Sequence, residues 1–161
     1  MIWRGLLVAG GLVLIANKLM ANNYRSFLNK PGLPRGIRNN NPGNLIKTTI
    51  PWQGKVTPSG DTRFEQFINI AYGLRAMIKD ILNDIGPNTS LEDLIYQYAP
   101  PSENNTIGYI NYISNKTGIE PNQVLTKDKA TIKKLVFAMS EMENGGSYLI
   151  DRDFNQAWAL L

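Results

Sequence analysis

Glu143 is the carboxylate of this sequence that is best placed to act as an acid or a base. The apolar residues before it recur at the spacing of one helix face: Ile132, Leu135, Val136 and Met139. Eleven residues after Ile132, a helix returns to within about 20° of its starting direction, and Glu143 holds that position. An apolar surrounding helps a carboxyl group to keep its proton at neutral pH, as a general acid must. The alternative interpretation is a frayed helix end that faces water.

The amino-acid composition limits the chemistry that such a carboxylate could serve. The chain contains no cysteine and no histidine. Their absence excludes disulfides, thiolate metal sites, cysteine nucleophiles and Ser-His-Asp catalysis. We therefore expect neither a metal ion nor a cofactor. A carboxylate that acts on a glycosidic bond needs neither histidine nor metal, so the composition is compatible with sugar cleavage.

Two further carboxylates, Asp61 and Glu65, are candidates for a second catalytic or water-positioning group. They lie in the segment GDTRFEQF, in which Phe64 and Phe67 are expected to face the core. This register predicts that Glu65 faces outward and that Asp61 lies in the turn. Either carboxylate could point into a cleft. The alternative interpretation is that both are solvated charges on a hairpin.

Asparagines and aromatic residues supply candidates for substrate binding. Asn41 and Asn44 belong to the turn-rich segment RGIRNNNPGN, whose amide groups suit the acetamido groups of a sugar. Trp52 and Tyr109 could provide flat faces on which a sugar stacks. Asparagine-rich turns are often only turns, however, and most aromatic residues of a domain this size belong to its core.

Most of the elements that would position these residues are predicted to be helices. Apolar periodicity and capping residues indicate helices over residues 71–85, 90–98, 105–118, 126–143 and 151–161. Residues 45–67 contain short β-like pieces separated by Pro51, Gly54 and Pro58, which we interpret as a small hairpin region. The predicted fold class is α+β, a mainly helical domain with a small β-hairpin region.

The first twenty residues differ from the rest of the chain. Residues 2–21 form its only long apolar stretch, and Trp3, Arg4 and Lys18 flank this stretch like interfacial anchors. As a helix, Trp3 to Met20 would span roughly 27 Å at about 1.5 Å per residue, marginally enough for a hydrocarbon core. We expect one transmembrane helix in residues 1–21 that contacts a lipid membrane, a linker at 22–34 and one domain at 35–161. A cleaved signal peptide and a buried helix are the alternatives.

The charge distribution bears on partners and on orientation. The net charge of +4 favours acidic partners, but the basic residues are scattered, so we expect no specific nucleic-acid partner. Several lysines and arginines follow the apolar stretch, and the positive-inside rule would keep the domain on the cytoplasmic side of a membrane. Delivery from a virus particle that carries its own membrane would place the domain on the side of the cell wall.

Several motifs resemble a family of phage and prophage virion-associated proteins of lysozyme-like or transglycosylase-like type. The segment RGIRNNNPGNL is followed by W-x-G, F-x-x-F, GLRA, APPSENNT and finally ENGG. The resemblance covers residues 35–148. In glucosaminidases and related lysozyme-like enzymes the catalytic helix precedes such motifs, whereas here the glutamate helix comes last. This order resembles a circular permutation, which compact domains tolerate because their termini often lie close together.

The resemblance implies a lysozyme-like fold and roles for individual residues. Glu143 takes the position of the catalytic acid, and Tyr109 matches a tyrosine that is common near such sites. Asn41 and Asn44 fall within the block that lines the cleft. Asn144, a further candidate for substrate binding, stands where many relatives have serine.

The activity implied by the resemblance is cleavage of the MurNAc–GlcNAc β-1,4 bond of peptidoglycan. Glu143 would protonate the glycosidic oxygen and then act as a base. A single well-placed carboxylate favours the lytic transglycosylase route, in which the sugar's own 6-hydroxyl closes on the anomeric carbon. A muramidase that uses Asp61 or Glu65 as its second carboxylate is the alternative mechanism.

The expected location follows from the anchor and the resemblance. We expect a membrane-anchored enzyme in the internal membrane of a virion, or in the host inner membrane facing the cell wall. It would act in cell entry or lysis. One alternative is a non-catalytic, membrane-anchored structural protein of the virion whose lysozyme-like domain binds glycan. Another is an endolysin of the host-lysis phase that is absent from the particle.

Overall fold

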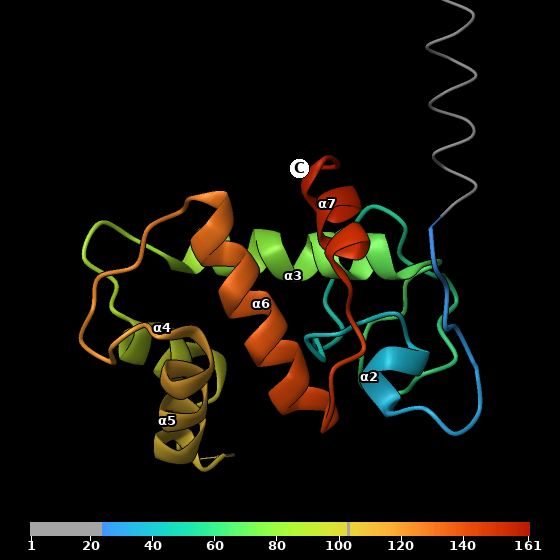
Figure 1. The fold of residues 1–161 in the computed structure, drawn as a ribbon. Helices are drawn as coiled ribbons and strands as arrows, with labels where there is room; N and C mark the ends of the chain where they lie inside the picture. Colours follow the sequence, from blue (N-terminus) through green and yellow to red (C-terminus); the bar gives the residue numbers. More distant parts are fainter. Residues whose placement is uncertain (1–23, 103) are drawn as a thin grey trace, which may run out of the picture.

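The computed structural model describes residues 24–102 and 104–161, and these residues form an almost entirely helical domain (Figure 1). The helices in this part of the chain are α2 (Arg35–Arg38), α3 (Ile70–Asp84), α4 (Leu91–Tyr98), α5 (Thr106–Thr117), α6 (Lys129–Asn144) and α7 (Asp151–Trp158). Figure 1 shows α6 crossing α3, with α4 and α5 on one side of it and α2 on the other.

The helix ends carry the capping residues that the sequence predicts. The side chains of Ser90, Asn105 and Asp128 accept hydrogen bonds from backbone N–H groups in the first turns of α4, α5 and α6. Gly118 and Gly145 end α5 and α6 with left-handed backbones, at φ of 71° and 66°. The end of α6 is therefore fixed two residues after Glu143.

The core lies where α3, α4, α5, α6 and α7 meet. Its fully buried side chains come from the apolar faces of these helices and include Leu74, Ile78, Ile81, Leu94, Ile113, Leu135, Met139 and Phe154. The apolar periodicity of the sequence identifies most of these residues, because each helix buries only one face. This core holds α3 and α6 in fixed positions relative to each other.

The structure corrects the predicted hairpin region. No described residue belongs to a β-strand, and residues 45–67 contain only isolated antiparallel bridges, Ile46 with Phe64 and Lys55 with Phe67. Turns at Pro51 and at Gly54, whose φ is 75°, interrupt the pairing before a ladder can form. The fold class α+β is therefore wrong, and the domain is mainly helical with an irregular loop in place of the hairpin.

The predicted membrane anchor receives no support from the described structure. No helix in residues 24–102 and 104–161 is both long enough and apolar enough to cross a bilayer. The predicted transmembrane segment, residues 2–21, lies outside the described residues. The fold class is corrected accordingly, to a helical domain without a demonstrated membrane-spanning element.

The predicted linker is in large part packed onto the domain. Arg25 forms an ion pair with the fully buried carboxylate of Asp153 on α7, and its guanidinium also donates to the Tyr148 carbonyl oxygen at 2.9 Å. The backbone N–H of Ile70 donates to the Arg25 carbonyl at 2.9 Å. Residues 24–28 therefore belong to the folded domain, which begins before residue 35.

Candidate active site

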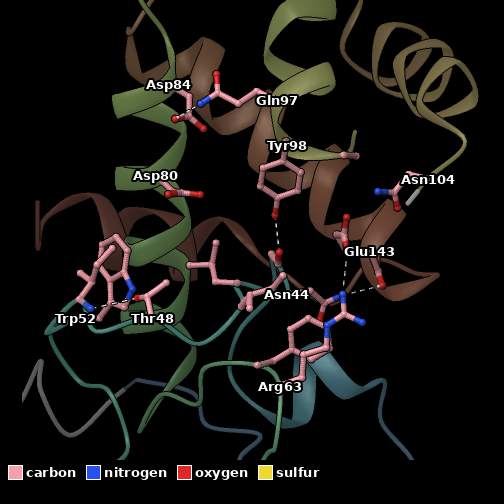
Figure 2. A pocket seen from close by; sticks show the side chains of 16 residues that line it. Asn44, Thr48, Trp52, Arg63, Asp80, Asp84, Gln97, Tyr98, Asn104 and Glu143 are labelled. Atoms are coloured by element: carbon pink, nitrogen blue, oxygen red, sulfur yellow. Dashed lines mark hydrogen bonds between the residues drawn. The ribbon is translucent and has the colours of Figure 1, made fainter. Parts of the chain in front are cut away.

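A cleft of about 510 Å³ lies at the C-terminal end of α6, and Glu143 lines it (Figure 2). One wall is formed by Asn44 of the asparagine-rich turn, residues 39–44, and by Thr48 and Trp52 of the irregular loop. The opposite side comes from α3 and from the end of α4. A volume in this range is typical of pockets that bind small molecules or segments of polymers.

The Glu143 carboxyl group is held by one donor on each oxygen. Asn44 Nδ2 donates to Oε2 at 2.9 Å, and the Tyr109 hydroxyl donates to Oε1 at 3.1 Å. The side chain is half-buried. Its surroundings are therefore more polar than the helix periodicity predicts, because the last turn of α6 faces the asparagine-rich turn. Each carboxyl oxygen keeps a second lone pair that can face the cleft.

Tyr109 is a neutral donor at any physiological pH. Its side chain is buried, and burial, the neighbouring Tyr98 and the Glu143 carboxylate all raise its pKa. A tyrosine hydroxyl both donates and accepts, so its contact with Glu143 can persist when the carboxyl group gains or loses a proton. Tyr109 therefore orients the carboxyl group and does not exchange protons itself.

Asn44 brings the turn into contact with α6. Its backbone is left-handed, at φ of 50°, a conformation that asparagine tolerates better than most residues. Its Nδ2 group reaches both the Glu143 carboxylate and, at 3.4 Å, the Glu143 carbonyl oxygen. Asn44 lines the cleft and positions the glutamate, whereas its role in substrate binding stays a prediction.

Asn41 and Asn144, both predicted to bind substrate, are buried and do not line the cleft. Asn41 Nδ2 donates to the carbonyl oxygens of Leu45 and Glu65, at 2.9 and 3.0 Å. Asn144 Nδ2 donates to the carbonyl oxygen of Pro42 at 2.9 Å and so ties α6 to the turn. Both residues hold backbone segments in place beside the cleft.

Trp52 is half-buried and lines the cleft, and its role in sugar stacking stays a prediction. Tyr109 lies behind Glu143 and is not among the lining residues. Of the residues predicted to act at the site, Asn44 and Tyr109 thus contact Glu143, and Trp52 lines the same cleft.

Glu65 is fully buried, contrary to the predicted outward orientation, and does not line the cleft. Its Oε1 accepts hydrogen bonds from Lys55 Nζ at 2.8 Å and from the Thr48 backbone N–H at 2.9 Å. Lys55 also donates to the Thr48 carbonyl oxygen at 2.7 Å. The pair therefore fixes the irregular loop that carries Trp52, because side-chain bonds there replace a strand ladder.

Asp61 also lies outside the cleft, where it organises the start of the domain. Arg35 donates to both of its oxygens at 2.8 Å, and Asn39 Nδ2 donates at 2.8 Å. The Arg35 guanidinium, the backbone N–H groups of Phe64 and Arg63, and Asn39 hold the pKa of Asp61 far below its usual range. With its acceptor sites occupied, Asp61 has a structural role.

This network predicts a pH-dependent effect of the substitution Asp61→Asn. Because the folded-state pKa is depressed, the ionised carboxylate stabilises the fold above the unfolded-state pKa of about 3.9. We expect the variant to lose about 2 kcal/mol of unfolding free energy at neutral pH. The difference should shrink as the pH falls below about 4. Urea unfolding of both proteins at a series of pH values measures it, and a difference that does not change with pH contradicts the assignment.

The cleft contains functional candidates that the sequence patterns do not reveal. Asp80 and Asp84 line it from α3, and Gln97, Tyr98 and Asn104 line it from α4 and the loop that follows. Asp80 and Asp84 are one turn apart at the edge of the apolar face of α3, a spacing that indicates a shared helix face but does not indicate a cleft. No group of three or more acidic side chains among the described residues is arranged to hold a metal ion.

These features define a small helical domain with an acidic cleft where α6 meets an asparagine-rich turn. No protein-family model matches the sequence. Over 119 residues the chain is 38% identical to protein P5 of Pseudoalteromonas phage PM2. The aligned region covers 70% of this chain and 72% of the phage protein. The chain therefore belongs to the same family as this bacteriophage protein.

Proposed function

We propose that this protein cleaves the glycan strands of peptidoglycan at the MurNAc–GlcNAc β-1,4 bond, with Glu143 as the acid and base. The observation that carries the proposal is the placement of the Glu143 carboxyl group in the cleft, with a donor on each oxygen. Fixed orientation of a single carboxyl group is what proton transfer to a glycosidic oxygen requires.

Of the two mechanisms, the lytic transglycosylase route agrees better with the positions of the predicted carboxylates. Asp61 and Glu65, the predicted partners for a muramidase, lie outside the cleft and are engaged in structural bonds. In the transglycosylase route Glu143 gives its proton to the leaving oxygen as the C1–O bond breaks. The carboxylate then takes the proton of the 6-hydroxyl, whose oxygen bonds to C1, and no water is consumed.

The relative is a bacteriophage protein, which is compatible with a place for this protein in a phage particle. We propose that the protein is part of the virion and acts during cell entry or lysis, because its family includes a phage protein. A structural protein whose cleft holds glycan without cutting it would share this location and would show no cleavage.

Digestion of purified peptidoglycan followed by mass spectrometry tests the proposed reaction. We expect muropeptides with 1,6-anhydro ends, which arise only when the sugar's own hydroxyl closes the ring. Products with reducing ends and one added water would replace the transglycosylase route by hydrolysis. Unchanged peptidoglycan in the presence of folded protein would refute the enzymatic function.

A further inference from the structure

The wall of the cleft formed by α3 carries a carboxylate to which the proposed reaction assigns no role. Asp80 and Asp84 line the same cleft as Glu143, and both side chains are half-buried. Figure 2 shows Asp80 and Trp52 toward one end of the cleft and Glu143 toward the other. A glycan strand that places a bond at Glu143 would therefore extend past Asp80.

Asp80 lacks the contacts that hold the other acidic side chains of this region. Asp84 accepts a hydrogen bond from Gln97 Nε2 at 2.7 Å. Within the described residues, the Asp80 carboxylate has neither a hydrogen-bond donor nor an ion-pair partner. Burial, with a contribution from the Asp84 carboxylate, raises the pKa of Asp80. The Asp80 oxygens are open to the cleft, so a ligand that brings donors can bind them directly in place of solvent.

The charges that line the cleft restrict which charged and hydrogen-bonding groups a ligand can carry. Among the described residues, three carboxylates, those of Asp80, Asp84 and Glu143, line it together with one guanidinium, that of Arg63. Sugar hydroxyl and amino groups donate hydrogen bonds, and an ammonium group also pairs with a carboxylate. A carboxylate or phosphate on the ligand would meet like charges near Asp80 and Asp84.

We propose that Asp80 binds the glycan directly, as an acceptor for hydroxyl or amino groups of a sugar next to the cleavage point. With Asp84 it makes this end of the cleft select sugars that carry donors and reject anionic substituents. This inference rests on the proposed function, since it takes the ligand to be a glycan. Asp80 acts in binding and specificity, whereas Glu143 carries out the bond cleavage.

Calorimetric titration with two defined oligosaccharides tests the inference. The ligands are chitotetraose and its fully de-N-acetylated form, and the background is the Glu143→Gln variant, so that neither ligand is consumed. At pH 6 and about 0.15 M salt, where long-range fields are screened, we expect the amino oligosaccharide to bind about tenfold more tightly. Because the chain has a net charge of +4, overall charge alone would give the opposite preference.

Adding Asp80→Asn to this background is expected to remove most of the preference, through a loss of about tenfold in affinity for the amino oligosaccharide. Glu120→Gln is the matched control, because Glu120 is exposed and does not line the cleft. It removes the same charge and should leave both affinities unchanged. Thermal unfolding at neutral pH is expected to show no loss of stability in Asp80→Asn, since the replaced carboxylate has no donor to lose.

Three results would overturn the inference: equal binding of the two oligosaccharides, a preference that survives Asp80→Asn, or no binding of either ligand. These results are independent of the peptidoglycan digestion. If digestion fails but binding depends on Asp80, the protein binds glycan and the proposed cleavage is refuted. If digestion succeeds but Asp80→Asn changes nothing, the cleavage stands and Asp80 has no part in recognition.

Discussion

The substitution Glu143→Gln is expected to lower peptidoglycan cleavage by about 10²- to 10⁴-fold, the usual contribution of a general acid or base. Glutamine has nearly the same shape but cannot give or take the proton. Its amide oxygen can still accept from Asn44, and its NH₂ group can donate to the Tyr109 hydroxyl. The fold should therefore remain within about 1 kcal/mol of the wild-type stability. Release of soluble muropeptides with time measures the effect.

Glu141→Gln is the matched control for this experiment. Glu141 lies two residues earlier on α6, outside the cleft, and pairs with Lys116 at 2.8 Å on the surface. Its replacement removes the same charge from the same helix but should leave the cleavage rate unchanged. Equal activity of Glu143→Gln and the wild type would remove Glu143 from the mechanism, whatever the control shows.

The substitution Gly73→Ala is expected to have the largest effect on stability. A Cβ atom at this position would lie 1.6 Å from the Asn40 carbonyl oxygen and 2.8 Å from the Asn40 carbonyl carbon. These are backbone atoms of Asn40, whose side chain is itself held in place. Asn40 Oδ1 accepts from the Phe27 backbone N–H, and Asn40 Nδ2 donates to the Phe67 carbonyl oxygen. The clash therefore cannot be relieved by a rotamer change, and α3 must move away from the turn.

We expect Gly73→Ala to cost at least about 3 kcal/mol, more than alanine gains by its better helix propensity of about 1 kcal/mol. Such a loss is a large fraction of the stability of an ordinary domain. Urea unfolding followed by circular dichroism measures it. Gly60→Ala is the control, because the nearest atom to a Cβ there, Gln66 Oε1, is 3.6 Å away. Similar stabilities of the two variants would show that the turn at Asn40 can move away from α3 despite the hydrogen bonds of the Asn40 side chain.

The sequence patterns were informative wherever a residue's environment is set by its own helix. Helix periodicity predicts the buried face of α6 and the position of Glu143 at its end, and local motifs predict caps such as Ser90 and Gly118. These signals depend on neighbours within one or two turns. For that reason they remain readable without knowledge of the fold.

Other parts of the site depend on contacts between distant segments. Asn44 and Glu143 are 99 residues apart in the chain, so no local pattern indicates that one donates to the other. The outward orientation predicted for Glu65 is wrong because Lys55 and the Thr48 backbone supply buried partners. Asp80 appears on α3 as an ordinary charged residue at the edge of an apolar face, and only the packing of α4 and the loop places it in a cleft.

The ion pair between Arg25 and Asp153 joins a segment near the start of the described domain to its last helix, α7. The Arg25 side chain pairs with Asp153 on α7, and the Arg25 carbonyl oxygen accepts a hydrogen bond from the backbone N–H of Ile70 at the start of α3. When the two ends of a domain are held together, circular permutation can change the order of its elements without changing which helices are neighbours. The glutamate helix, α6, follows the asparagine-rich turn in sequence and contacts it through the hydrogen bond from Asn44 to Glu143.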